Sequence, residues 1–193
     1  QAILYYIYRL KQAGKIPDIP VFLDSPMAQE VTTTMLSHTE DYRYSKSFYE
    51  AACKVARHVS DVEESKQIDT SKSPKIIISA SGMLTGGRVL HHIKAFADDK
   101  RNVILLSGYQ AVGTRGDALL RGNKKIKIYG EVVAVEAEVV ALSNMSAHVD
   151  YKEMIDWLEG IATPPRKVFI THGGVEAAES LQNKIKDTLK WQC

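Results

Sequence analysis

Two histidines in the last quarter of the chain have the residue type and setting to do chemistry. His148 lies in residues 143–150 (SNMSAHVD) and His172 in residues 167–174 (KVFITHGG). Each follows an apolar, strand-like run and precedes a helical pattern, and polar side chains at the carboxyl ends of strands face the functional crevice of α/β proteins. A neutral imidazole is a common metal ligand, and a protonated one can donate a proton or stabilise developing negative charge. We therefore expect half of an active centre here, with the other half outside this chain.

Both histidines also have a structural interpretation. His172 could satisfy a turn or the start of a helix, and the residues alone favour that role over a metal ligand. His148 could simply precede a helix whose first turn is capped by Asp150. For His148 the structural and the chemical roles can hold together.

Two loops that contain glycine offer groups for binding phosphate. The loop at residues 79–88 includes Arg88, and the loop at residues 107–116 includes Arg115. Backbone N–H groups at a helix start bind phosphate, and an arginine adds a fork of donors. The alternative is a pair of tight strand-to-helix connections with solvated arginines, and the residues alone favour it.

Three further polar residues carry weaker signals. The side chain of Asp24 or Ser25 is expected to cap a helix that begins at Pro26, which leaves Asp24 without a direct chemical role. His91 and His92 are adjacent, so they diverge by about 100° on a helix. His91 then points away from the apolar face and His92 lies on its flank, which disfavours a metal pair.

Composition is that of an ordinary globular protein. The 193 residues are 45% hydrophobic and 25% charged, with a net charge of +2, so nothing global requires nucleic acid, although a local basic surface is allowed. Cys53 and Cys193 lack metal or redox spacing and favour a reducing, cytoplasmic setting. No apolar run is long enough for a membrane span, and no signal peptide is visible, so we expect no membrane partner. The chain opens inside a helical pattern, which suggests a fragment of a longer polypeptide.

Hydrophobic periodicity predicts an α/β fold with a mostly parallel sheet covered by helices. Residues 61–74 are polar and are expected to form a surface loop. After Gly122 the pattern changes to alternation at residues 125–129 and a hairpin at Gly130-Glu131, and we place a domain boundary there. The expected helices cover residues 3–10, 26–35, 48–59, 89–96, 151–158 and 178–189, and the expected strands cover residues 20–23, 75–79, 102–106, 125–129, 132–139 and 168–170.

Seven short motifs occur in one order along nearly the whole chain. They are DSPMA at 24–28, SASGM at 79–83, GGR at 86–88, GYQ at 108–110, GT at 113–114, SAHVD at 146–150 and THG at 171–173. This ordered set resembles the β-CASP branch of the metallo-β-lactamase-fold ribonucleases, RNA-processing exonuclease-like proteins related to the cleavage-and-polyadenylation endonuclease.

The resemblance implies a domain organisation and a set of roles. Residues 1–122 would form most of the β-CASP cap, and residues 123–193 would be a C-terminal returning segment of the metallo-β-lactamase domain. The full-length parent would be a zinc-dependent ribonuclease that hydrolyses RNA phosphodiester bonds, with His172 as a metal ligand and His148 as a catalytic residue. The residues expected to contact single-stranded RNA are Ser81, Gly82, Arg88, Gly108 and Arg115.

The family's main metal motif is expected upstream of Gln1. This chain alone is therefore expected to be inactive and to hold no stable zinc, with the missing N-terminal half as its partner and a homodimer left open. A non-enzymatic Rossmann-like nucleotide- or RNA-binding module is the main alternative. A serine or aspartate hydrolase built on Asp24-Ser25 is disfavoured, because no Gly-x-Ser-x-Gly elbow is present.

Overall fold

A computed structural model describes residues 1–38, 40, 44–142, 145 and 148–193 of the chain. These residues form two compact units, residues 1–146 and residues 147–193. The boundary expected near residue 122 separates two family domains, whereas this division separates two compact units. The expected boundary stays a prediction. Among the described residues, no helix combines the length and the apolar character needed to cross a membrane.

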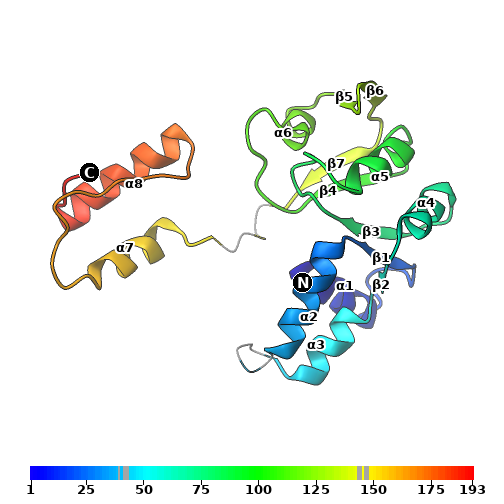
Figure 1. Ribbon diagram of the computed structural model, residues 1–193, viewed down its shortest axis with the longest axis horizontal. Helices are drawn as coiled ribbons and strands as arrows, with labels where there is room; N and C mark the ends of the chain where they lie inside the picture. The colour runs from blue at the N-terminus through cyan, green and yellow to red at the C-terminus, as the bar shows by residue number, and fades with distance from the viewer. Residues whose placement is uncertain (39, 41–43, 143–144, 146–147) are drawn as a thin grey trace. The chain divides into compact units, whose positions relative to one another are not determined.

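The first half of the larger unit is built around a parallel three-stranded sheet (Figure 1). Strand β1 lies between β2 and β3, with Leu23 aligned with Ile78 across the β1–β3 pair. Its elements are α1 (Ala2–Gln12), β1 (Val21–Asp24), α2 (Pro26–Ser37), α3 (Lys46–Cys53), β2 (Arg57–His58), α4 (Val62–Thr70) and β3 (Ile76–Ser79). The buried side chains of Leu4, Ile7 and Val21 form a core with Leu23, so β1 is held by an apolar face of α1.

Local sequence explains where α2 begins. Ser25 has extended backbone, and its Oγ accepts the Ala28 N–H at 3.2 Å, so Ser25 is the cap of α2. Pro26 occupies the first turn, where its missing N–H costs nothing. The predicted cap is thus confirmed for Ser25, and the carboxylate of Asp24 is left for other contacts.

The surface loop expected at residues 61–74 is wrong. Residues 62–70 form helix α4, whose cap Asp61 accepts the Glu64 N–H at 2.8 Å. The polar composition concealed a narrow buried stripe that contains Ser65 and Ile68. The spacing of Asp61 and Glu64 is that of a capping box, which is the signal that would have predicted this helix.

The second half of the larger unit has one parallel and one antiparallel strand pair. Strand β4 pairs in parallel with β7, and β5 pairs antiparallel with β6 through a tight turn at Tyr129 and Gly130. Both turn residues have positive φ, as a two-residue hairpin of type I′ requires. The elements are α5 (Val89–Phe96), β4 (Val103–Leu106), α6 (Arg115–Leu120), β5 (Lys125–Ile128), β6 (Glu131–Ala134) and β7 (Glu138–Ala141).

The expected strand at residues 132–139 is therefore two strands, β6 and β7, which pair with different partners. Leu90, Ile128 and Val135 are among the fully buried side chains of a core that α5, β5 and the following segment share. The α/β class with mostly parallel pairing is confirmed.

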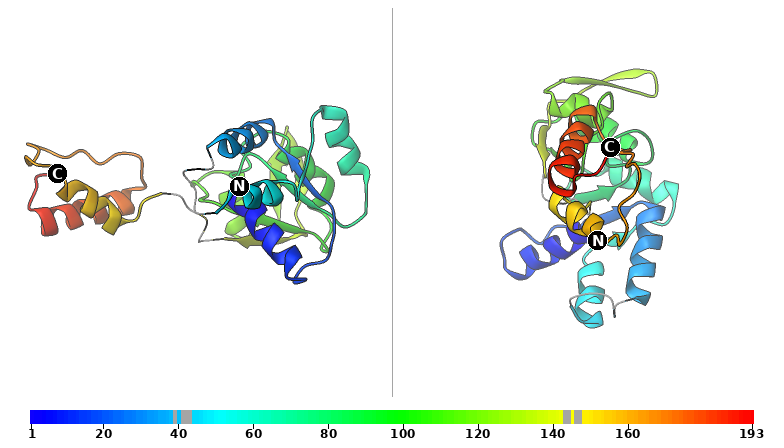
Figure 2. Two further views of the ribbon diagram at one scale, coloured as in Figure 1. Left: turned by 90° about the horizontal axis from the view of Figure 1, so that it is seen from below. Right: turned by 90° about the vertical axis from the view of Figure 1, so that its left-hand side faces the viewer.

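The smaller unit consists of helices α7 (Tyr151–Glu159) and α8 (Val175–Leu189), which pack together through Ile155, Leu158 and Ile185 (Figure 2). The strand expected at residues 168–170 is wrong. The Val168 N–H donates to the Gln192 carbonyl at 2.8 Å, but no described strand pairs with this segment. Apolar composition favours extended backbone, yet a strand also needs a partner for its hydrogen bonds.

Candidate functional site

The two glycine-containing loops lie against each other beyond the ends of β3 and β4. The Gln110 amide donates to the Gly82 carbonyl at 2.9 Å and to the Gly108 carbonyl at 3.0 Å. The Gly116 N–H donates to the Met83 carbonyl at 3.2 Å. The structure thus brings together the loops that carry the five residues expected to contact RNA, through contacts that the sequence did not predict.

Close packing explains a glycine in each loop. A Cβ atom at Gly116 would lie 1.6 Å from Oε1 of Gln110, which is buried and has no hydrogen-bond partner among the described residues. A Cβ atom at Gly87 would lie 2.7 Å from the Ala80 carbonyl oxygen, and the φ of Gly87 is +82°. Only glycine fits these two positions without displacement of a neighbour.

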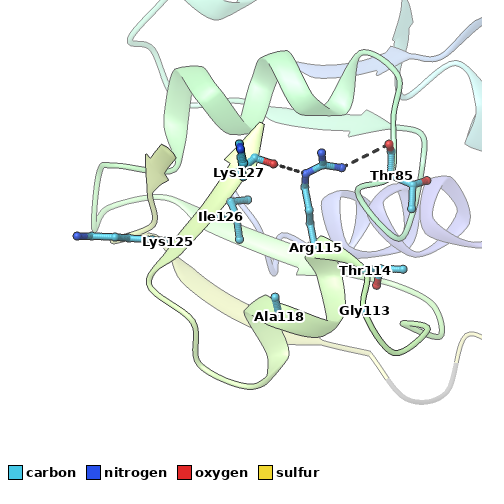
Figure 3. A pocket seen from close by; sticks show the side chains of 8 residues that line it. All are labelled: Thr85, Gly113, Thr114, Arg115, Ala118, Lys125, Ile126 and Lys127. Carbon is cyan, nitrogen blue, oxygen red and sulfur yellow. Dashed lines mark hydrogen bonds between the residues drawn. The ribbon is translucent and has the colours of Figure 1, made fainter. Parts of the chain in front are cut away.

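Arg115 joins the second loop to the first and to strand β5. Its Nε donates to the Lys127 carbonyl at 2.5 Å, and its Nη1 donates to the Thr85 carbonyl at 3.4 Å (Figure 3). Nη1 also donates to the Leu84 carbonyl at 2.9 Å. These partners are neutral carbonyl groups, so none of them compensates the positive charge of the guanidinium. It lines an open pocket of about 460 Å³.

Arg88 has a different setting. Its Nη1 donates to the buried carboxylate of Asp24 at 2.5 Å and to the Val59 carbonyl at 3.3 Å, and its side chain is 20% exposed. Its positive charge is therefore compensated inside the unit. The RNA contact expected for Arg88 stays a prediction, and the geometry gives this arginine a clear structural role.

Asp24 is the centre of a buried polar network that the sequence did not reveal. Its side chain is fully buried and accepts hydrogen bonds from Ser65 Oγ at 2.5 Å and from Arg88. Nε2 of His92 lies 2.8 Å from Asp24 Oδ2, and Nδ1 of His92 lies 2.6 Å from Asp69 Oδ1. His92 therefore links two carboxylates, whereas the sequence placed it on the flank of its helix.

Hydrogen bonds decide the ionisation of this network. Burial raises the pKa of Asp24, but hydrogen bonds from Ser65, Arg88 and His92 outweigh it and hold the pKa below its usual value. Burial lowers the pKa of His92, but its contacts with Asp69 and Asp24 outweigh burial and raise the pKa above its usual value. With His92 protonated, the network pairs two carboxylates with a guanidinium and an imidazolium, so its charges sum to zero.

His148 and His172 both belong to the smaller unit, and both are exposed. His148 lies just before α7, where Asp150 and Glu153 form a capping box. Ser146 and Ala147 of the motif lie outside the described residues. His172 follows an extended segment rather than a strand, and its φ of 61° is in the left-handed region. The expectation that these two histidines form half of an active centre stays a prediction.

The left-handed backbone at His172 is unusual for a residue with a side chain. Such a conformation costs about 1–2 kcal/mol for most residues, although histidine tolerates it better than bulky ones. An outlier of this kind supports a functional hypothesis, because surrounding structure must maintain it.

The described residues do not make a zinc centre on their own. They contain no group of three or more His, Cys, Asp or Glu side chains that could hold a metal ion. A catalytic zinc needs about three protein ligands, so a zinc site would require ligands beyond those gathered here.

Two family models match the chain. A Beta-Casp domain matches residues 1–119, and a Zn-dependent metallo-hydrolase RNA specificity domain matches residues 132–193. The first match alone covers more than half of the chain.

This chain belongs to the β-CASP family. The resemblance inferred from its motifs is therefore confirmed. Within this β-CASP chain, the Asp24 network and both glycine-containing loops lie in the first matched region. His148 and His172 lie in the second.

The chain is similar in sequence to several curated proteins. A ribonuclease from Thermus thermophilus is 34% identical over 185 residues, which cover 91% of this chain and 41% of the relative. An RNase J-like protein from Methanocaldococcus jannaschii is 32% identical over 196 residues, which cover 98% of this chain and 44% of the relative. A transcription termination factor from Methanosarcina mazei is 30% identical over 202 residues, which cover 98% of this chain and 32% of the relative. The chain thus spans less than half the length of these relatives.

Proposed function

We propose that this chain is part of a zinc-dependent ribonuclease that hydrolyses phosphodiester bonds of single-stranded RNA. The observation that carries the proposal is the match of residues 132–193, which contain both candidate histidines, to a Zn-dependent metallo-hydrolase RNA specificity domain. The Beta-Casp match upstream and the relatives named as ribonucleases support the same chemistry. A cytoplasmic location and a homodimer stay predictions.

The two domain matches also support the proposed organisation. Residues 1–122 are proposed as most of the cap and residues 123–193 as the returning lactamase segment. The gap between the two matches, residues 120–131, contains that boundary.

His172 is proposed as one zinc ligand in the whole protein. Its support is an exposed imidazole on a left-handed turn, directly before Gly173 and Gly174. When bound, zinc would supply an activated water for attack on the phosphate. The other ligands would come from outside the residues described.

His148 is proposed to act on the reacting phosphate rather than on the metal. A protonated imidazole near the scissile bond stabilises the charge that develops on the phosphoryl and leaving oxygens. The capping box of Asp150 and Glu153 fixes the backbone two residues after His148, which supports a defined position for its ring.

The test uses the whole protein, with substitutions at each histidine. His172→Ala should reduce zinc content and ribonuclease activity together. His172→Gly should do the same without straining the turn, because glycine accepts positive φ freely. His148→Ala should lower turnover by about 100-fold or more while zinc content stays nearly full.

Equal zinc loss in the His148 and His172 variants would reject this division of roles. RNA binding by wild-type protein with no cleavage, measured with zinc present, would favour the non-enzymatic RNA-binding module instead. Activity in both histidine variants equal to wild type would remove these residues from the site.

A further inference from the structure

The charged residues that line the pocket beside Arg115 are all positive. Its lining includes three cationic residues, Arg115, Lys125 and Lys127, and no carboxylate (Figure 3). Among the described residues, neither lysine takes part in an ion pair. Asp117, on the neighbouring helix, is already engaged by Arg121 at 3.0 Å and by the Gly113 N–H at 3.0 Å. In a chain whose net charge is only +2, this is a local positive surface.

Strand geometry holds the two lysines outward. Ile126 and Ile128 alternate with them along β5 and are buried, at 5% and 0% exposure. Period-two alternation therefore places both ammonium groups on the solvent side. The Lys125 side chain extends away from Arg115 along the rim of the pocket, so the cations are spread out rather than gathered at one point (Figure 3).

The shape of the pocket favours a polymer over a small molecule. Small-molecule sites enclose most of the ligand and are largely apolar. This pocket is open, and cations are distributed along it. Arg115 donates hydrogen bonds to three backbone carbonyl groups. Because these partners are neutral, Arg115 can bind an anion without breaking an ion pair.

We propose that this pocket binds consecutive phosphates of single-stranded RNA through Arg115, Lys125 and Lys127. The inference rests on the proposed function and deepens it, because it locates an RNA-backbone contact on β5 and the second loop. Ammonium and guanidinium groups contact phosphate without reading bases, so the contact is independent of sequence. It positions RNA and takes no part in bond cleavage.

The experiment compares RNA affinity of the whole protein with that of a Lys125→Ala/Lys127→Ala variant. Binding of a single-stranded oligonucleotide is titrated at several salt concentrations, with catalysis prevented by chelation of the metal. The slope of log affinity against log salt is negative, and each lost phosphate contact should make it shallower by about 0.7. The slope of the double variant should therefore be shallower than that of wild type by about 1.4. Affinity at low salt should fall by roughly tenfold or more.

The matched control is Lys15→Ala/Lys54→Ala, which removes the same charge from exposed lysines outside the pocket. It should keep the affinity and the salt slope of wild type. A second arm adds inorganic phosphate or a mononucleotide as competitor, at concentrations matched in phosphate to the RNA.

Loss of affinity and slope in the Lys125/Lys127 variant alone supports the inference. Equal behaviour of the two double variants, or no RNA binding by wild type, overturns it. Competition by free phosphate as strong as that by RNA also overturns it, in favour of a small-anion site. Binding as expected by a protein that cleaves no RNA would defeat the proposed function and leave this inference intact.

Discussion

The carboxylate of Asp24 lies where three elements of the larger unit meet. Asp24 is the last residue of β1, and it accepts a hydrogen bond from Ser65 on α4. It also contacts Arg88 at the start of α5 and His92 on the buried face of that helix. These contacts span up to 68 positions along the chain. A single buried side chain thus fixes the relative placement of β1, α4 and α5.

Replacing Asp24 by alanine should strongly destabilise the larger unit. Asp24→Ala leaves the cations of Arg88 and His92 without their shared carboxylate, and such a loss costs about 3–5 kcal/mol. Denaturant unfolding of the chain would measure it. Asp18→Ala is the control, because this carboxylate pairs with Lys11 at an exposed position and should matter little. A loss for Asp24→Ala no larger than for Asp18→Ala would contradict the role of the network.

The contribution of His92 to the folding stability of the larger unit should depend on pH. Its folded-state pKa is raised, so its stabilising effect is fully present below the unfolded pKa of about 6.5 and is lost as pH rises through the folded value. The pKa of Asp24 is lowered, so its effect is present above about 3.9 and is lost as pH falls through the folded value. The network is therefore most stabilising between about pH 3.9 and about pH 6.5.

His92→Gln tests this dependence. The difference in unfolding free energy between wild type and variant should be largest near pH 5 and should shrink steadily towards pH 9. Urea unfolding at intervals of one pH unit would follow it. A difference that grows with rising pH would show that His92 is held in its neutral form.

Only part of this site could be predicted from sequence. The cap at Ser25 was predictable, because a serine before proline acts within one helical turn. The pairing of His92 with Asp69 was not, since it joins residues 23 positions apart and needs a helix that the polar sequence concealed. Arg88 was predicted to face RNA because no local pattern reveals a buried carboxylate 64 positions away.

At the scale of elements, the two loops are held together by contacts of Gln110 and Gly116. Gln110 holds the Gly82 and Gly108 carbonyl groups, and Gly116 leaves room for its amide. Arg115, next to Gly116, extends the same connection to β5. The loop contacts are therefore coupled to the shape of the phosphate-binding pocket proposed above.

Gly116→Ala should loosen this connection. The new Cβ would overlap Gln110 Oε1, and crowding of a packed interior costs about 1–3 kcal/mol. Thermal unfolding would show the loss. Gly82→Ala is the comparison, since nothing lies near its added Cβ. Adding Gln110→Ala should recover part of the loss in Gly116→Ala, and purely additive effects would argue against direct overlap.

Elements with strong apolar periodicity were predictable, and those defined by distant partners were not. The repeat of Leu181, Ile185 and Leu189 marked α8 correctly, because one helix face buries its own side chains. The helix expected to reach Val59 ends at Cys53, since Arg57 and His58 pair with β1 instead. Strand pairing depends on residues far away, which periodicity does not record.

At the scale of the whole molecule, the proposed zinc site would need ligands beyond the described residues. Zinc added to residues 1–193 should not be retained in stoichiometric amount, because the described part of this chain gathers no set of three ligands. Metal analysis after dialysis would test it, with the whole protein as the positive comparison. One zinc retained per chain by residues 1–193 would require a site that the described residues do not form, and would refute the expectation.

The raised pKa of His92 has a calorimetric consequence. Because the pKa of His92 is raised in the folded state, its imidazole binds more proton in the folded state than in the unfolded state at pH values between the two pKa values. Folding of the larger unit therefore takes up a fraction of a proton from the buffer, and unfolding returns it. The heat of unfolding will then include the ionisation heat of whichever buffer accepts that proton, so it will differ between phosphate and Tris at the same pH and stability.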